Sequence, residues 1–291
     1  MSDLLDIADR VVAMAKPGEQ VEAFVARGSE TDVRVYRGEV EHFVSAQSEG
    51  IGIRVIRDGK TGFAYAGTLD PGVVAEVLAD ARENVAFGTT DPFAGVAQPD
   101  GVTVTDVELW SDELAHFAVE DKIALAKELE QYVLGADARV TVEDANYADG
   151  GAEAAVANTA GIRRYGRENG CYLVVSSLAE DDGEMQTGFG FSVGRQPDEL
   201  SVAKAGGDAA ERATRLLGAI KPASKRTTVV LSPYVTAQFL GIIGATLNGE
   251  SVSKGRSLFR DRLGDAMANP LVTLVDDPTN PLAYTATDVD G

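Results

Sequence analysis

The 291-residue sequence has a formal net charge of −20, with 46 Asp and Glu against 26 Lys and Arg. Nucleic acids and anionic lipids are bound by clustered basic residues, so this balance argues against direct contact with either. We expect a soluble protein of the reducing cytoplasm, because the single cysteine excludes an intrachain disulfide and no apolar run suits a bilayer span or a signal peptide.

In the first third of the chain, residues 3–15 place apolar side chains at helical spacing, and Pro17-Gly18 ends this helix. Short antiparallel strands are expected next, at 21–25, 32–37, 40–46, 52–56 and 62–66. Asp58-Gly59 predicts a hairpin turn, because glycine readily takes a positive φ. Asp70-Pro71 predicts the start of a second helix.

The middle of the chain begins with a connection, residues 91–112, in which only Val102–Val107 has strand character. A helix is expected at 120–135 and another at about 199–217, with Gly206-Gly207 as a weak point. Between these helices the alternating pattern predicts strands at 139–144, 152–158, 163–166, 172–179 and 185–193.

These elements predict an α+β fold of antiparallel sheets with packed helices. Residues 1–90 and 119–218 look alike, and their hairpins share the steps Thr61-Gly62-Phe63 and Thr187-Gly188-Phe189. We take an internal duplication as a hypothesis, with an accidental likeness of two meanders as an equal alternative. Different strand orders in the two halves would contradict the duplication.

After a linker at 221–226, the pattern predicts a buried strand at 228–231 and a helix from Ser232-Pro233 to Leu247. This helix is apolar on nearly all sides, so we expect it in a core, and Asn248-Gly249 ends it. A last strand is expected at 271–275. We therefore divide the chain into an N-terminal domain, 1–220, and the beginning of a second, mainly β domain, 221–291. That second domain is interpreted as incomplete.

Residues for catalysis or metal binding are scarce. The chain has two histidines and no HExxH, HxxE or CxxC spacing, so a zinc site would need His42, His116 and Cys171 to converge. Cys171 lies in a predicted strand, where a buried inert thiol is expected. Asp181-Asp182 and Asp276-Asp277 could hold Mg²⁺ or Ca²⁺, but solvated turn carboxylates are more common. No residue is assigned a catalytic or metal-binding role.

Three stretches together resemble the TldD/PmbA family, also named modulators of DNA gyrase. Residues 48–64 are similar to the family's G-x-x-x-R-V-x-x-x-G-x-x-G-F-A hairpin. The second stretch is Val229–Pro233 with the following helix and Leu247–Glu250. The third comprises residues 257–264, 274–278 and 288–291.

The resemblance implies a PmbA-like subunit without catalysis of its own. In the peptidase branch, the helix after the Val-Val-Leu strand carries an H-E-x-x-x-H zinc motif, whose positions fall here on Leu240, Gly241 and Ala245. It further implies that zinc is held by a TldD-like partner, with no cofactor in this chain, and that a cytoplasmic pair encloses a chamber for peptides or unfolded small proteins. Acidic residues expected near such a chamber are Glu250, Asp276, Asp277, Asp288 and Asp290.

Three alternatives stay open. The chain could pair with itself as a homodimer. It could be a metallopeptidase in its own right, with atypical ligands, or an indirect modulator of DNA gyrase that acts through peptides. The sequence pI of about 4.4 weighs against direct nucleic-acid contact.

Overall fold

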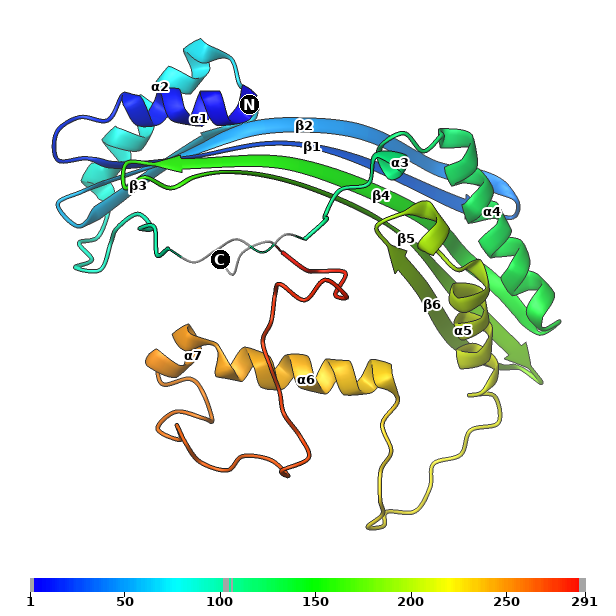
Figure 1. Ribbon diagram of the computed structural model, residues 1–291. Helices are drawn as coiled ribbons and strands as arrows, with labels where there is room; N and C mark the ends of the chain where they lie inside the picture. The colour runs from blue at the N-terminus through cyan, green and yellow to red at the C-terminus, as the bar shows by residue number, and fades with distance from the viewer. Residues whose placement is uncertain (1–2, 102–104, 106, 288–291) are drawn as a thin grey trace. The chain divides into compact units, whose positions relative to one another are not determined.

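The computed structural model describes residues 3–101, 105 and 107–287 (Figure 1). The chain forms two compact units. One runs up to residue 219 and also includes the chain from residue 278 onward, and the other is residues 220–277.

The first unit is built on a six-stranded antiparallel sheet with the order β3-β2-β1-β4-β5-β6. Its strands are β1 (Gln20–Tyr36), β2 (Glu39–Arg57), β3 (Lys60–Ala66), β4 (Val140–Asn158), β5 (Arg163–Asp181) and β6 (Glu184–Gly194). β1 and β4 pair antiparallel in the middle, so each half contributes a three-strand meander to one continuous sheet. The α+β class with an antiparallel sheet and packed helices is thereby confirmed.

Several short strands predicted separately are parts of longer ones. The segments 21–25 and 32–37 both lie in β1, 40–46 and 52–56 in β2, 139–144 and 152–158 in β4, and 163–166 and 172–179 in β5. The prediction of separate strands was wrong, because the middles of the long strands are polar and glycine-rich and show no alternation of apolar residues. Their backbone ladders nevertheless continue without interruption, as between Arg27–Thr31 and Asp149–Glu153.

Four helices cover the convex face of the curved sheet (Figure 1). α1 (Asp3–Ala13) and α2 (Pro71–Asn84) pack over one end, and α4 (Val119–Ala136) and α5 (Val202–Thr214) pack over the other. Each pair closes its own hydrophobic cluster. The first is built around Leu4, Ile53 and Leu78, and the second around Leu129, Tyr147 and Leu173. The opposite, concave face has none of these four helices on it.

The local signals at turns and helix starts are confirmed. Asp58 and Gly59 have φ values of 54° and 72°, as the tight β2–β3 hairpin requires. The Asp70 side chain caps α2 by accepting hydrogen bonds from Gly72 N at 2.9 Å and Val73 N at 3.2 Å. The helix expected at 120–135 is α4. The one expected at 199–217 is shorter, because a 3₁₀ turn, η2 (Pro197–Glu199), precedes α5.

The two halves share one order of elements: helix, three-strand meander, helix. Their strand orders do not differ, so the duplication hypothesis passes the test set for it. Between the halves run the 3₁₀ turn η1 (Val85–Phe87), an irregular connection and the short helix α3 (Asp112–Ala115). The strand expected at Val102–Val107 lies largely outside the described residues, and the described Thr105 and Val107 are in no strand.

The second unit contains α6 (Pro233–Leu247) and α7 (Gly249–Ser253). The strands expected at 228–231 and 271–275 are wrong, since both segments are irregular and exposed. Mainly β structure is therefore not found among the described residues after 220. α6 begins at the Ser232 cap and ends before Asn248 as predicted, but it has no buried residue, so its expected place in a core is also wrong.

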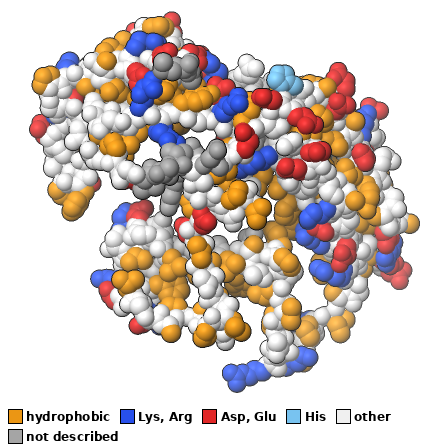
Figure 2. All heavy atoms as spheres, viewed as in Figure 1, with side chains coloured by type: hydrophobic (Ala, Val, Ile, Leu, Met, Phe, Trp, Pro, Cys, Tyr) orange, Lys and Arg blue, Asp and Glu red, His pale blue; other side chains and the backbone are white. Residues whose placement is uncertain are grey.

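The physical reason is that the described residues of this unit form no sheet on which α6 could pack. α6 makes its contacts with the short helix α7. Its apolar side chains contribute to the orange surface in the lower part of the space-filling view (Figure 2). No helix within residues 3–101 and 107–287 has the length and apolar content needed to cross a membrane.

Candidate functional site

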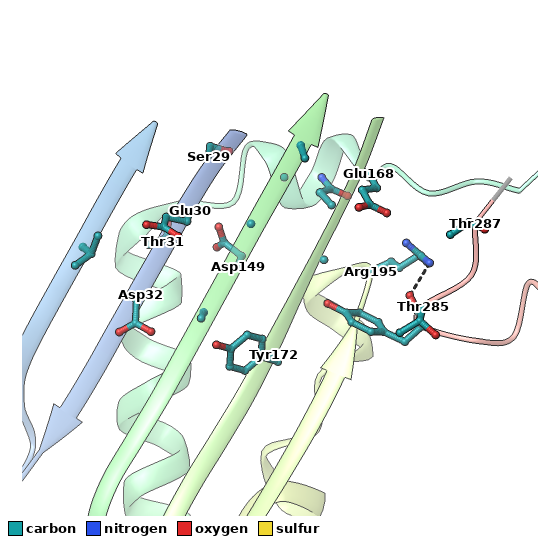
Figure 3. Close-up of a pocket in the computed structure, with 18 residues that line it drawn as sticks. Ser29, Glu30, Thr31, Asp32, Asp149, Glu168, Tyr172, Arg195, Thr285 and Thr287 are labelled. Carbon is teal, nitrogen blue, oxygen red and sulfur yellow. Dashed lines mark hydrogen bonds between the residues drawn. The ribbon is translucent and has the colours of Figure 1, made fainter. Parts of the chain in front are cut away.

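The concave face carries a hollow of about 760 Å³ at the middle of β1, β4 and β5 (Figure 3). Residues paired across neighbouring strands share a face, which defines the rows of its floor. One row is Glu30, Gly150 and Gly170, and the next is Asp32, Ala148 and Tyr172. The floor is open because its central positions are glycine or alanine.

Tyr284, from the segment that returns to this unit after residue 278, forms one wall of the hollow. A Cβ at Gly170 would lie 2.4 Å from the Tyr284 Oη, so only glycine lets this ring settle on the sheet. Arg195 Nη2 donates a hydrogen bond to the Tyr284 carbonyl oxygen at 2.7 Å. Burial raises the pKa of the Tyr284 hydroxyl above its ordinary value.

A buried ion pair lies behind the floor, on the helix-covered face. Lys122 Nζ of α4 is 2.6 Å from the Asp149 Oδ2 of β4, and it donates a hydrogen bond to Thr31 Oγ1 at 3.1 Å. The Tyr147 hydroxyl donates to the same carboxylate oxygen at 2.7 Å. Burial raises the pKa of the Tyr147 hydroxyl most, and its hydrogen bond to the Asp149 carboxylate raises the pKa further. The Asp149 carboxylate is thus paired with Lys122 and hydrogen-bonded by Tyr147, and the cluster fixes α4 to the sheet.

The rim of the hollow is mainly acidic. Glu30, Asp32 and Glu168 line it, with Arg195 as the basic side chain among its lining residues (Figure 3). This surface suits a polar or basic extended ligand better than a phosphate group, which needs clustered cations or N–H donors.

The sequence analysis named His42, His116 and Cys171 as residues that could bind zinc only if the fold brought them together. The structure does not bring them together. Within the described residues, no group of three or more His, Cys, Asp and Glu side chains has the arrangement of a metal site. His42 and His116 are both exposed. Cys171 is fully buried, and burial with the charge of Asp149 raises the pKa of its thiol to about 12, which explains an inert thiol.

The acidic candidates are separated. Glu250 lies in α7 and pairs with Lys254, which lowers the pKa of its carboxyl, and Asp276 and Asp277 are exposed in an irregular segment of the second unit. Asp288 and Asp290 lie outside the described residues. In the first unit, Asp181 pairs with Arg139 at 3.1 Å and Asp182 occupies a hairpin turn.

The residues of α6 do not fit a zinc ion. Leu240, Gly241 and Ala245 are the residues predicted to stand at the motif positions, and none of them has a nitrogen, oxygen or sulfur in its side chain. The helix itself is formed, with Ser232 Oγ accepting from Val235 N at 3.4 Å.

Sequence reasoning missed both the residues that build the hollow and the ion pair behind its floor. Lys122 follows Glu120 and Asp121, so the sequence suggests a solvent-exposed start of the helix. Tyr284 is far from β5 in the sequence. The one available signal was glycine inside strands, at Gly150-Gly151 and Gly170, because glycine in a strand often marks close approach of another group.

Comparison with known families shows the family to which the chain belongs. Three family models match the chain in order: PmbA/TldA metallopeptidase domain 1 at residues 21–85, the central domain at 112–217 and the C-terminal domain at 224–291. The chain belongs to the PmbA/TldD family. The resemblance seen in the sequence is thereby confirmed. The borders proposed at residue 220 stay a prediction.

Curated relatives in this family carry the name metalloprotease. The chain is 24% identical to metalloprotease PmbA of Escherichia coli O157:H7, over 93% of this chain and 61% of that protein. It is 26% identical to a metalloprotease of Methanothermobacter thermautotrophicus, over 96% of this chain and 60% of the relative. The chain thus spans about three fifths of these PmbA/TldD proteins.

Solved structures of this fold agree. A Thermotoga maritima protein described as a modulator of a DNA gyrase has a TM-score of 0.81 and 23% identity, over 97% of this chain and 64% of its own. TldE from Thermococcus kodakarensis has a TM-score of 0.79 and 16% identity, and the match covers 98% of this chain and 63% of TldE. These likenesses show the PmbA/TldD fold.

Proposed function

We propose that this PmbA/TldD chain is a non-catalytic subunit of a cytoplasmic metallopeptidase complex that acts on peptides or unfolded small proteins. Zinc is then supplied by a TldD-like partner that carries the H-E-x-x-x-H motif. The present chain contributes surfaces for the partner and the peptide, and no metal ligand.

The composition of α6 carries this proposal. The helix keeps its start at Ser232-Pro233 and its end at Asn248, but Leu240, Gly241 and Ala245 replace the groups that would bind zinc and move a proton. A zinc ligand must offer nitrogen, oxygen or sulfur, so a peptidase centre on this helix has no chemical basis.

The concave face of the first unit supports a role in handling chains. Exposed aromatic side chains lie at both ends of it, Phe63 and Tyr65 on β3 and Phe189 on β6, and small residues lie between them. The Phe63 and Tyr65 rings stack on each other and form one exposed apolar surface at the β3 end. Together with the acidic rim of the hollow, they suit peptides that present apolar and basic side chains.

Co-expression tests the proposal directly. The chain is produced with a PmbA/TldD family member of the same genome that carries H-E-x-x-x-H, and the mixture is analysed by size exclusion with light scattering and by peptidase assay. We expect a stoichiometric complex that cleaves peptides, while this chain alone cleaves none. A matched complex whose partner has the motif glutamate changed to glutamine should form equally well and be inactive.

Two results would contradict the proposal. One is chelator-sensitive peptide cleavage by this chain alone, which would favour a metallopeptidase with atypical ligands. The other is a failure of every motif-bearing family member of that genome to bind it. An effect on DNA gyrase is expected only indirectly, through a peptide that the complex cleaves.

A further inference from the structure

The outer edge of β2 is open along its first part. β3 pairs only with residues 51–57 of β2, so residues 39–50 have β1 on one side. Among the described residues no strand pairs with their other side. Residues 39–49 are exposed except for the half-buried Val44. Such an edge presents unsatisfied N–H and C=O groups that can pair with another extended chain.

This edge lacks the usual protection against pairing. Residues 42–48, with the sequence His-Phe-Val-Ser-Ala-Gln-Ser, include no proline, lysine or carboxylate. Natural edge strands are commonly blocked by such residues or by a covering segment. Residues 42–48 are therefore free to pair with another extended chain.

The matching edge in the other half of the sheet is protected. β6 pairs with β5 only from Cys171 onward, so residues 163–170 of β5 extend beyond the end of β6. In the same way, residues 39–50 of β2 extend beyond the end of β3. The β5 segment contains Arg163, Arg164, Arg167 and Glu168. In addition, Asn169 N donates to Leu109 O at 2.9 Å, and the Asn169 amide bonds both backbone groups of Ser111. Of these two overhanging segments, the one in β2 is therefore the open one.

Charge next to the open edge indicates what would bind there. On the concave face, Ala46 pairs with Glu30 and Val44 with Asp32, and a hollow of about 210 Å³ between β1 and β2 is lined by Glu30 and Ala46. The small β2 side chains leave both carboxylates within reach of a long side chain on an added strand, whose Cα atoms would lie about 10 Å from those of β1.

The other face of the same edge carries one exposed aromatic side chain, with Glu41 and Ser45 beside it on the same face. Phe43 is 43% exposed and lies beside the buried Val33, which belongs to the core under α4. Side chains alternate between the two faces of a strand, so a partner strand would place basic residues toward Glu30 and Asp32 and apolar residues toward Phe43. A second copy is disfavoured, because two such edges would bring Glu39, Glu41 and Glu49 of both chains together.

We propose that residues 42–48 of β2 bind an extended peptide as an added edge strand, and that the preferred peptides alternate basic and apolar residues. Backbone pairing gives the affinity, and Glu30, Asp32 and Phe43 give the preference. The inference rests on the peptide-handling function proposed above and names its substrate class and its place on the chain.

A direct test uses a fluorescein-labelled decapeptide of alternating lysine and valine, titrated with the full chain in the absence of any partner. Fluorescence anisotropy should show saturable binding. The same peptide N-methylated on every residue keeps its charge and loses its N–H donors, so it should bind at least about tenfold more weakly. Equal binding of the two peptides would show simple charge attraction and overturn the proposal.

Variants locate the site. Ala46→Lys places a cation beside Glu30 on the open edge and should weaken binding of the unmethylated peptide about tenfold. Thr187→Lys adds the same charge to an exposed position on the same face of β6 and should leave binding unchanged. Circular dichroism and thermal melting check that both variants fold. Equal loss in both variants, or in neither, would contradict the assignment to β2.

Hydrogen exchange gives a second readout. The peptide should protect amides within residues 39–50, and protection at 163–170 instead would overturn the proposal. These measurements need no motif-bearing partner, so their failure is distinguishable from a failure of complex formation. A chain that binds the peptide at β2 and never finds a peptidase partner would contradict only the proposed function.

Discussion

Gly62 and Gly188 occupy corresponding places in the two halves of the sheet, each under the backbone of the helix that follows its meander. A Cβ at Gly62 would lie 2.1 Å from the Ala81 carbonyl oxygen of α2, and one at Gly188 would lie 2.2 Å from that of Ala209 in α5. Only hydrogen fits at either position. The Thr-Gly-Phe likeness of the two hairpins therefore has a packing cause.

Alanine at either glycine is expected to destabilise the fold. Gly62→Ala and Gly188→Ala each force a helix away from the sheet, and overpacking of this kind costs about 1–3 kcal/mol. Gly135→Ala is the control, since a Cβ at this position in α4 would meet no atom within 4 Å and should be neutral or slightly stabilising. Urea unfolding measures all three, and equal stability of Gly62→Ala and wild type would contradict the packing argument.

The Lys122–Asp149 pair predicts a strong coupling. Lys122→Met leaves the Asp149 carboxylate buried without its cation, and breaking a buried pair in this way costs about 3–5 kcal/mol. Asp149→Asn in the same chain removes that uncompensated charge. The double variant should therefore be less destabilised than the sum of the two single variants. Additive free energies of unfolding in this double-mutant cycle would show that the pair is not coupled.

Cys171 predicts a loss of stability at high pH. Its folded pKa of about 12 lies above the ordinary value near 9, so the protonated thiol stabilises the fold fully below pH 9. This contribution decreases as the pH rises from 9 toward 12. The free energy of unfolding should fall more steeply between pH 8.5 and 10 in wild type than in Cys171→Ala, by up to about 1.4 kcal/mol per pH unit. Parallel pH profiles would contradict burial of the thiol.

Asn169 is predicted to hold the connection before α3 against β5. Its buried amide accepts from Ser111 N and donates to Ser111 O, both at 2.8 Å. Asn169→Leu leaves these groups unsatisfied, at a cost of about 1–3 kcal/mol. Limited proteolysis should then cut near Trp110. Asn158→Leu is the matched control, because Asn158 bonds Ala97 O at 3.0 Å and its loss should leave the Trp110 site protected.

The sequence predicted the helices and turns of the first unit well, because their signals are local. Asp70 caps α2 and Asp58-Gly59 turns between β2 and β3 through contacts within a few residues. Strand continuity was not predicted, since Gly150 and Gly170 interrupt the apolar alternation while the backbone ladder continues. A ladder is a property of two strands, and a single-strand pattern does not reveal it.

The candidate site was less accessible for a similar reason. Lys122 meets Asp149, and Tyr284 meets Gly170, only after distant segments have folded together. For α6 the apolar pattern predicted burial, but such a pattern indicates a need for cover and does not identify what supplies it. By contrast, the sequence alone shows that Leu240, Gly241 and Ala245 carry no metal-binding group, and their assignment to the positions of the zinc motif stays a prediction from the family resemblance.

Zinc stoichiometry decides whether this chain can be a non-catalytic subunit. The purified full chain is dialysed without chelator, and its zinc is measured by plasma mass spectrometry, with the motif-bearing partner treated in parallel. We expect a zinc content near zero for this chain and about one zinc for each partner chain, as a single protein site gives. About one zinc in this chain, retained when it is purified alone, would contradict its assignment as a subunit without catalysis of its own.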